Sequence, residues 1–175
     1  MVKWGAEYKR LVEGKLPIRI SNGKIILIEK ATINDISMIF QLQQQLFSTK
    51  VIYLQELYKT QDELYNNFGK GVYFKAVNEK EEIIGSLCAS FFSKNRLEIF
   101  LLFVNPNFRN EGIALNLLSE LEKICLCTSY EIHINSSNTI AVSFFENRGY
   151  IQWNSTQNHI CLKKDGKLSD EISNN

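Results

Sequence analysis

The chain has little of what several functional classes of protein require. It contains two histidines and four cysteines in 175 residues, and these do not stand at the spacing of metal ligands. Cys125 and Cys127 are two positions apart, so a helix would point them in different directions, which does not suit chelation. We therefore expect no metal site, reduced and buried thiols, and structural or surface roles for His133 and His159.

Long apolar runs and a strong charge bias are absent as well. No window reaches the length of a transmembrane helix, and the segment 1–5 lacks the apolar core of a secretion signal, which predicts a cytoplasmic protein without a membrane partner. The formal net charge of +1 gives no general attraction for nucleic acid, so a nucleic-acid partner is not expected. The apolar fraction of 45% is typical of globular proteins, and the length suits one domain.

The most informative stretch is residues 104–114, which read V-N-P-N-F-R-N-E-G-I-A. The residues before it, 97–104, are apolar on both faces beyond Glu98, which is typical of a central strand covered on both sides. After it, the small residues Gly112 and Ala114 leave the backbone uncovered where a helix is expected to begin. Successive N–H groups and the positive end of the helix can face an anion there. The junction therefore predicts a phosphate-binding loop.

A second segment, residues 138–150, reads N-T-I-A-V-S-F-F-E-N-R-G-Y and follows an expected strand at 130–135. The R-x-x-G-x-A of the first segment and the N-x-x-A-x-x-(aromatic pair)-x-x-x-G-(aromatic) of the second resemble the GCN5-related N-acetyltransferase (GNAT) superfamily. Two loose motifs in the right order, separated by a helix and a strand, arise by chance much less often than either alone. The resemblance covers about residues 25–163.

The resemblance implies an α/β (α+β) protein with the GNAT fold, in which helices flank a mixed central sheet of about six to seven strands. Periodicity and capping residues predict elements in the order that this superfamily shows. We interpret 1–24 as an amino-terminal appendage, 25–164 as the acetyltransferase domain and 165–175 as a loose tail. Strands are expected at 25–31, 72–77, 83–92, 97–104, 130–135, 150–153 and 159–163, and helices at 32–46, 60–68, 112–127 and 138–147.

The resemblance also implies acetyl-CoA as co-substrate and direct transfer of its acetyl group to a primary amine in a ternary complex. In the family, loop amides bind the pyrophosphate, a strand edge pairs with the pantetheine amides, and the second motif accommodates the pantetheine arm. The Val104 amide would also polarise the thioester carbonyl. The cofactor-binding residues carried over in this way are Leu102, Phe103, Val104, Arg109, Asn110, Glu111, Gly112, Ile113, Ala114, Asn138, Ala141 and Phe145.

The acceptor is expected to be a small-molecule amine or an amine of a peptide or protein, and the chain to be a monomer or homodimer. In the family the acceptor site is formed by the first two helices and the late strand loops, which correspond here to residues 47–68 and 154–158. Side chains there that would surround a cationic amine, or equally be ordinary surface, are Tyr53, Glu56, Tyr58, Asp62 and Tyr65.

Glu98 is the candidate catalytic base. It lies in the strand that leads to the phosphate loop, at a position that matches the base glutamate of the family's histone-acetylating branch. Strand periodicity places it on the same face as Phe100, Leu102 and Val104, where a partly buried carboxylate would accept a proton directly or through water. The alternative is an exposed glutamate at the polar start of a strand.

Two residues depart from the family pattern. Glu111 brings a carboxylate next to the predicted pyrophosphate site, which weakens binding unless the side chain points to solvent. Phe145 stands where the family often has a tyrosine acid, and a phenyl ring cannot donate a proton. Either water protonates the departing thiolate, or a side chain such as Ser143 or Tyr130 does so, or catalysis has been lost. The last case is an alternative function, a non-catalytic acyl-CoA sensor or interaction module.

Overall fold

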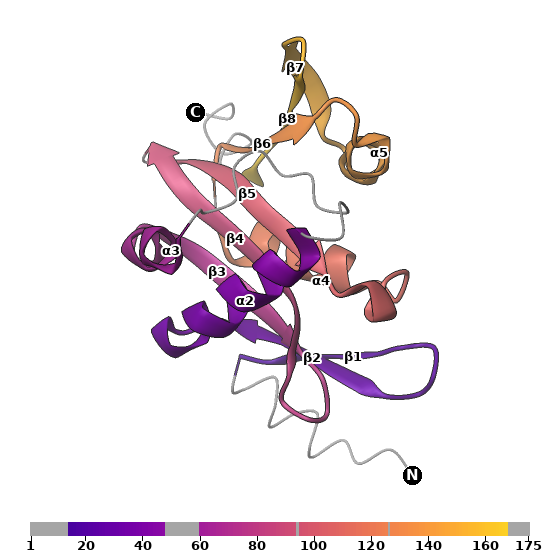
Figure 1. Cartoon of the computed structure of the whole chain (residues 1–175). Helices are drawn as coiled ribbons and strands as arrows, with labels where there is room; N and C mark the ends of the chain where they lie inside the picture. The colour runs from indigo at the N-terminus through magenta and orange to yellow at the C-terminus, as the bar shows by residue number, and fades with distance from the viewer. Residues whose placement is uncertain (1–13, 48–59, 94, 126, 168–175) are drawn as a thin grey trace.

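The computed structural model describes residues 14–47, 60–93, 95–125 and 127–167. One mixed sheet of eight strands, in the order β1-β2-β3-β4-β5-β6-β8-β7, runs through the molecule (Figure 1). The strands are β1 Leu16–Arg19, β2 Ile25–Lys30, β3 Gly71–Val77, β4 Ile83–Ser93, β5 Arg96–Val104, β6 Ser129–Asn135, β7 Ile151–Ser155 and β8 His159–Asp165. The helices are α2 Ile36–Phe47, α3 Gln61–Phe68, α4 Ile113–Ile124 and α5 Thr139–Glu146, and short 3-10 turns span Ile33–Asp35 and Pro106–Phe108.

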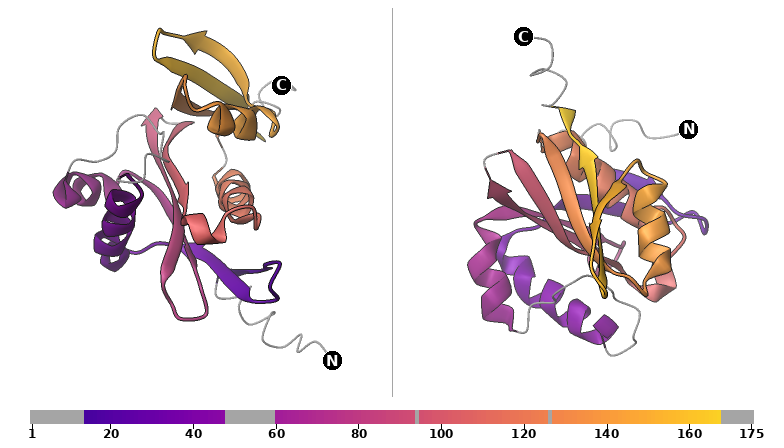
Figure 2. Two further views of the ribbon diagram at one scale, coloured as in Figure 1. Left: turned by 45° about the vertical axis from the view of Figure 1, so that its right-hand side comes forward. Right: turned by 90° about the horizontal axis from the view of Figure 1, so that it is seen from above.

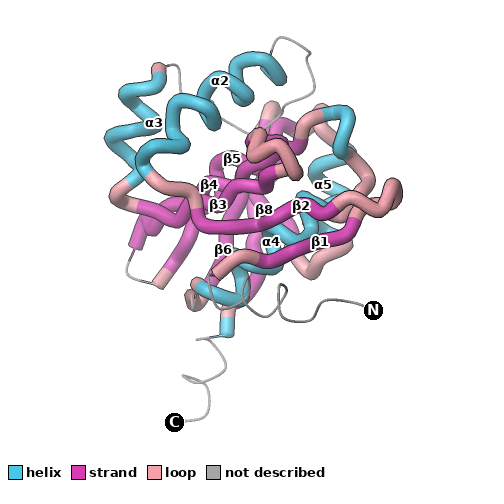
Figure 3. Tube along the Cα trace, turned by 90° about the horizontal axis from the view of Figure 1, so that it is seen from below, coloured by secondary structure: helices cyan, strands magenta, loops and turns pink. Residues whose placement is uncertain are grey.

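The helices cover the two faces of the sheet in pairs (Figures 2 and 3). Helices α2 and α3 pack on one face through a cluster that includes Ile39 and Leu64, and α4 and α5 pack on the other through Leu117 and Phe145. No helix in the described part of the chain is both long enough and apolar enough to span a membrane. The predicted mixed α and β class is therefore confirmed, and each predicted strand and helix is present to within a few residues of its expected ends.

The sheet has one strand more than the sequence predicted. The additional strand, β1, pairs antiparallel with β2 and lies in the range interpreted as an appendage. Its four residues contain Pro17 and are too few to show the alternation of a strand, so only the pairing with β2 reveals it. The sheet thus extends into the range 1–24, while the domain boundaries themselves stay predictions.

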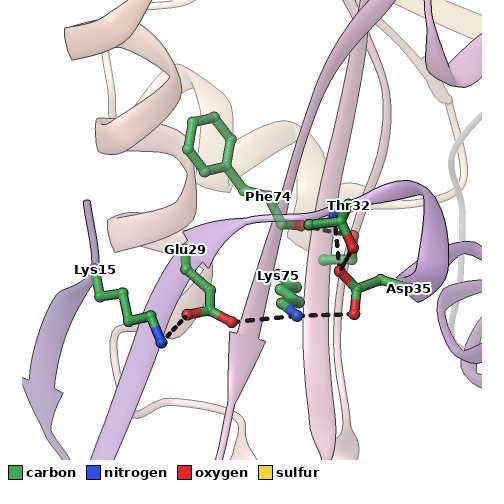
Figure 4. A network of polar contacts seen from close by, with 7 residues as sticks. Lys15, Glu29, Thr32, Asp35, Phe74 and Lys75 are labelled. Atoms are coloured by element: carbon green, nitrogen blue, oxygen red, sulfur yellow. Dashed lines mark hydrogen bonds and ion pairs between the residues drawn. The ribbon is translucent and has the colours of Figure 1, made fainter. Parts of the chain in front are cut away.

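A chain of ion pairs fixes the start of α2 to the sheet (Figure 4). Lys75 of β3 lies 2.8 Å from Asp35 and 3.2 Å from Glu29 of β2, and Lys15 contacts Glu29 at 3.2 Å. Burial alone raises the pKa of Asp35, but hydrogen bonds from Lys75 and from Thr32 outweigh it and lower that pKa. The Asp35 carboxylate also closes a capping box with Thr32, because it accepts a hydrogen bond from the Thr32 backbone N–H at 2.7 Å.

A β-bulge in β5 changes which side chains share a face. Cys88 of β4 pairs with Leu101, whereas the next residue, Ala89, pairs with Ile99, so Phe100 is an additional residue in β5. After the bulge the alternation is shifted by one position. Leu97 and Ile99, on either side of Glu98, pack in the cluster of the α4 face. Because side chains alternate along a strand, Glu98 lies on the opposite face, which α2 and α3 cover.

The expectation that Glu98 shares a face with Leu102 and Val104 was wrong for this reason. Leu102 and Val104 pack in the cluster of the α4 face, together with Leu97 and Ile99. A strict period of two cannot anticipate a bulge, because the inserted residue reverses the direction of every later side chain.

The bulge also precedes a separation of β5 from β6. These parallel strands pair from Arg96 to Ile99 on β5 and from Ser129 to Ile132 on β6. In the described sheet the pairing ends there, so the second half of β5 has no strand partner on its β6 side. This unpaired segment, residues 100–104, is called the free edge of β5 below.

Candidate active site

The free edge of β5 presents main-chain groups of Leu102 and Val104. The Asn105 N–H donates to the Ile84 carbonyl at 2.7 Å, and Val104 pairs with Gly85. In an antiparallel ladder alternate residues direct their N–H and C=O toward the partner strand. The main-chain N–H and C=O of Phe103 therefore point toward β4, while those of Leu102 and Val104 point away from β4. The family resemblance implies that a strand edge here pairs with the pantetheine amides. Leu102 and Val104 direct main-chain groups outward from the free edge, whereas the main-chain N–H and C=O of Phe103 do not.

The free edge leads directly into the loop predicted to hold phosphate. Asn105 stabilises the first turn, since its side chain accepts from the Asn107 N–H at 3.0 Å. Two residues of the loop have left-handed backbones, Asn110 at φ 61° and Gly112 at φ 77°. Such alternation turns successive N–H groups toward a shared concavity that suits an anion. The side chain of Arg109 folds back on the strand, and its Nε donates to the Val104 carbonyl at 3.1 Å.

Helix α4 begins immediately after this loop. Gly112 is its N-cap, and the Gly112 carbonyl accepts from the backbone N–H of Asn116 at 3.0 Å and from its side chain at 2.8 Å. Ile113 is buried and Ala114 half-buried against the core, which anchors the first turn. Because the first N–H groups of a helix have no acceptor within it, they are available to an anion at this end.

The Glu111 side chain is bound by a turn from another part of the chain. Its carboxylate accepts two hydrogen bonds from Ser21, in the turn between β1 and β2: one from the backbone N–H at 2.7 Å and one from the hydroxyl at 2.5 Å. The hydroxyl bond and then the backbone bond lower the pKa of Glu111. Both oxygens of the carboxylate thus have a hydrogen-bond partner outside the loop amides.

Glu98 has a neighbour that the sequence did not identify. Oε1 of Glu98 lies 3.5 Å from Nδ1 of His133 on β6, and the side chains are 35% and 30% exposed. Beside them Glu131, in register with Glu98, is buried and paired with Arg96. A carboxylate and an imidazole that both reach solvent can pass a proton between them. His133 was interpreted as structural or surface because the sequence showed no paired metal ligand for it, and its neighbour Glu98 lies on the adjacent strand.

The second motif forms the start of α5. The Asn138 side chain caps this helix by accepting from the Ala141 N–H at 3.1 Å, and Ala141 is half-buried on the core. Phe145 is 1% exposed, with ring centroids of Phe144 and Tyr150 each 5.1 Å away in edge-on geometry. The end of the motif is therefore an aromatic cluster that joins α5 to the sheet.

The alternatives to a tyrosine at position 145 differ in their surroundings. The Tyr130 hydroxyl donates toward the carbonyls of Cys125, at 2.5 Å, and Glu122, at 3.2 Å, which lie at the end of α4 remote from the phosphate loop. Burial is the main cause that raises the pKa of Tyr130. Ser143 is exposed on α5. The Tyr130 hydroxyl thus has acceptors at the far end of α4.

Phe145→Tyr is expected to destabilise the fold by about 1–3 kcal/mol, because a hydroxyl added to a fully buried ring loses its hydration without gaining a hydrogen bond. Chemical denaturation measures this loss. Phe144→Tyr is the matched control, since the neighbouring ring is only half-buried and the Arg148 guanidinium carbon lies 3.7 Å from its centroid. This control should lower the free energy of unfolding by less. A Phe145→Tyr variant that is as stable as the parent and turns over faster would place the new hydroxyl beside the reacting sulfur instead.

Of the residues expected near the acceptor, Tyr53, Glu56 and Tyr58 lie outside the described residues, while Asp62 and Tyr65 are exposed on α3. Residues 154–158, which comprise the end of β7 and the turn to β8, are exposed as well. The four cysteines are buried with free thiols, as the sequence predicted, and burial raises the pKa of Cys88 to about 12.

The amino-acid sequence matches a known protein family. Residues 36–150 match the model of the acetyltransferase (GNAT) family. No curated protein sequence matches the chain significantly.

Solved structures resemble the chain despite low sequence identity. The GNAT domain of S. lividans PAT superposes with a TM-score of 0.73 at 14% identity, covering 87% of this chain and 97% of that one. A ribosomal-protein-alanine N-acetyltransferase from Escherichia coli gives 0.67 at 13%, with 80% and 93% covered. The PaiA N-acetyltransferase from Thermoplasma acidophilum, in complex with coenzyme A, gives 0.67 at 16%, with 80% and 98% covered. These structures share the fold, and the family-model match over residues 36–150 shows that the chain belongs to the GNAT family of acetyltransferases.

Proposed function

We propose that the chain transfers an acetyl group from acetyl-CoA to a primary amine by direct attack in a ternary complex. The observation that carries this proposal is the continuity between the free edge of β5 and the left-handed loop that opens α4. A strand edge suits the amides of an extended pantetheine arm, and the loop amides suit a pyrophosphate at its end. Acetyl-CoA supplies the activated acetyl thioester.

Each step of the transfer has a candidate group. The main-chain N–H of Val104 donates to the thioester carbonyl and stabilises charge that develops on its oxygen. Glu98 takes a proton from the ammonium form of the acceptor, which leaves the neutral amine to attack, and His133 at 3.5 Å is placed to pass that proton to solvent. The amine nitrogen bonds to the acetyl carbon and loses its second proton to water. The carbon–sulfur bond breaks, and the thiolate takes a proton from water.

The bulge at Phe100 places the proposed base and the strand edge proposed to bind coenzyme on different sides of the sheet. It places the Glu98 side chain on the face of α2 and α3, while Leu102 and Val104 turn their side chains to the face of α4. The amine would thus approach from the α2 side. The acceptor is proposed to be a small-molecule amine or a peptide or protein amine; among the structural neighbours, the Escherichia coli enzyme is named for a protein alanine.

A second candidate is a non-catalytic acyl-CoA sensor, which the buried Phe145 favours because it supplies no acid. Calorimetry with coenzyme A, together with thiol release from acetyl-CoA in the presence of an amine panel, separates the two. Binding with thiol release and an acetylated product identified by mass spectrometry supports the transferase. Binding without release from any amine supports the sensor, and no binding contradicts both.

A further inference from the structure

We propose that Ser21 is a positioning residue for the coenzyme, because it holds the Glu111 carboxylate away from the amides that receive the pyrophosphate. This inference rests on the proposed function, in which the loop at residues 109–114 binds that pyrophosphate. It concerns two residues that are far apart in sequence: Ser21 lies in the turn between β1 and β2, and Glu111 lies in the loop just before α4.

The turn that carries Ser21 is internally fixed. The Ile20 N–H donates to the Lys24 carbonyl at 3.0 Å, and the Gly23 N–H donates to the Ile20 carbonyl at 2.9 Å. The Asn22 side chain accepts from the Lys24 N–H at 3.0 Å. These bonds involve the neighbours of Ser21, whereas both donors of Ser21 itself are directed to Glu111. The turn therefore acts as a rigid support with two donors aimed at one carboxylate.

Glu111 lies among the loop amides that are proposed to bind phosphate. It stands between Asn110 and Gly112, the two left-handed residues, and its own N–H belongs to the run of amides proposed to face phosphate. A carboxylate accepts from backbone N–H groups as phosphate does, so a released Glu111 side chain would compete for the same donors. It would also repel the pyrophosphate by direct charge interaction. The bonds from Ser21 prevent this competition and weaken the repulsion by fixing the carboxylate toward the turn between β1 and β2, while the charge itself remains.

Ser21→Ala is expected to weaken binding of coenzyme A, measured by calorimetry, by about three- to tenfold at low salt. The loss should become smaller in about 0.5 M salt, since the repulsion is between exposed charges. Asn22→Ala is the matched control: it removes a hydrogen bond from the same turn but leaves Ser21 and Glu111 intact, so its affinity should equal the parent's. Both variants are checked by circular dichroism, and both changes are in an exposed turn.

The decisive comparison is made in the Glu111→Gln background. Without the charge, Ser21→Ala should have no further effect on affinity, because the repulsive group is gone. An equal loss in both backgrounds, an equal loss in Asn22→Ala, or an unchanged affinity in Ser21→Ala would each overturn the role of Ser21. Failure of the parent protein to bind coenzyme A would instead contradict the proposed function, so the two failures are distinguishable.

Discussion

Gly112→Val is expected to remove most of the affinity for coenzyme A, by at least about tenfold in the dissociation constant, while the far-ultraviolet circular dichroism stays that of the parent. Gly112 has a φ of 77°, which a β-branched residue reaches only at a cost of about 1–3 kcal/mol. A Cβ at this position would meet Asn116 at 3.5 Å, an ordinary contact, so space is available and the backbone angle is the obstacle. The loop relieves the strain by rotating, which turns its amides away from the phosphate.

Gly14→Val is the control for strain alone. Gly14 has a φ of 73° with open space around its Cβ direction, and it lies outside both motif segments. We expect a similar fall in melting temperature for the two variants but a loss of coenzyme affinity only for Gly112→Val. Unaltered binding by Gly112→Val would place the coenzyme elsewhere on the molecule.

Glu98→Gln is expected to lower turnover by about a hundredfold or more at neutral pH, with little change in coenzyme affinity. The amide keeps the shape of the side chain but cannot accept the proton of the amine. The loss should decrease as pH rises, because more of the acceptor then arrives already deprotonated. Steady-state kinetics over a range of pH, with any amine that the acceptor panel identifies, measures this effect.

Glu82→Gln is the control for removal of a carboxylate, since Glu82 lies in the turn between β3 and β4 and bonds Asn78 at 2.7 Å. It should leave turnover unchanged throughout the pH range. A Glu98→Gln variant with the parent's profile would return Glu98 to the role of an exposed residue at the start of a strand. The base would then have to be His133 or water.

Much of the fold could be predicted because its signals are local. The apolar run at 97–104 and the caps at Thr32 and Thr60 depend on neighbours within a few residues, and the structure contains the corresponding strand and helices. The two motifs are local as well, since each is a strand or helix end with small residues at fixed offsets. Membership of the GNAT family followed from them and is confirmed by the match over residues 36–150.

By itself, then, the sequence determined the element types, their order and the family, because period, capping and turn chemistry are set by short-range physics. Only the tertiary structure decided the bulge at Phe100, the pairing of β1, the contact of Ser21 with Glu111 and that of Glu98 with His133. Strand register and contacts between distant segments depend on how whole surfaces pack, and no single segment carries that information. The candidate base was visible in one strand, but its neighbour and the face it occupies were set by the strands beside it.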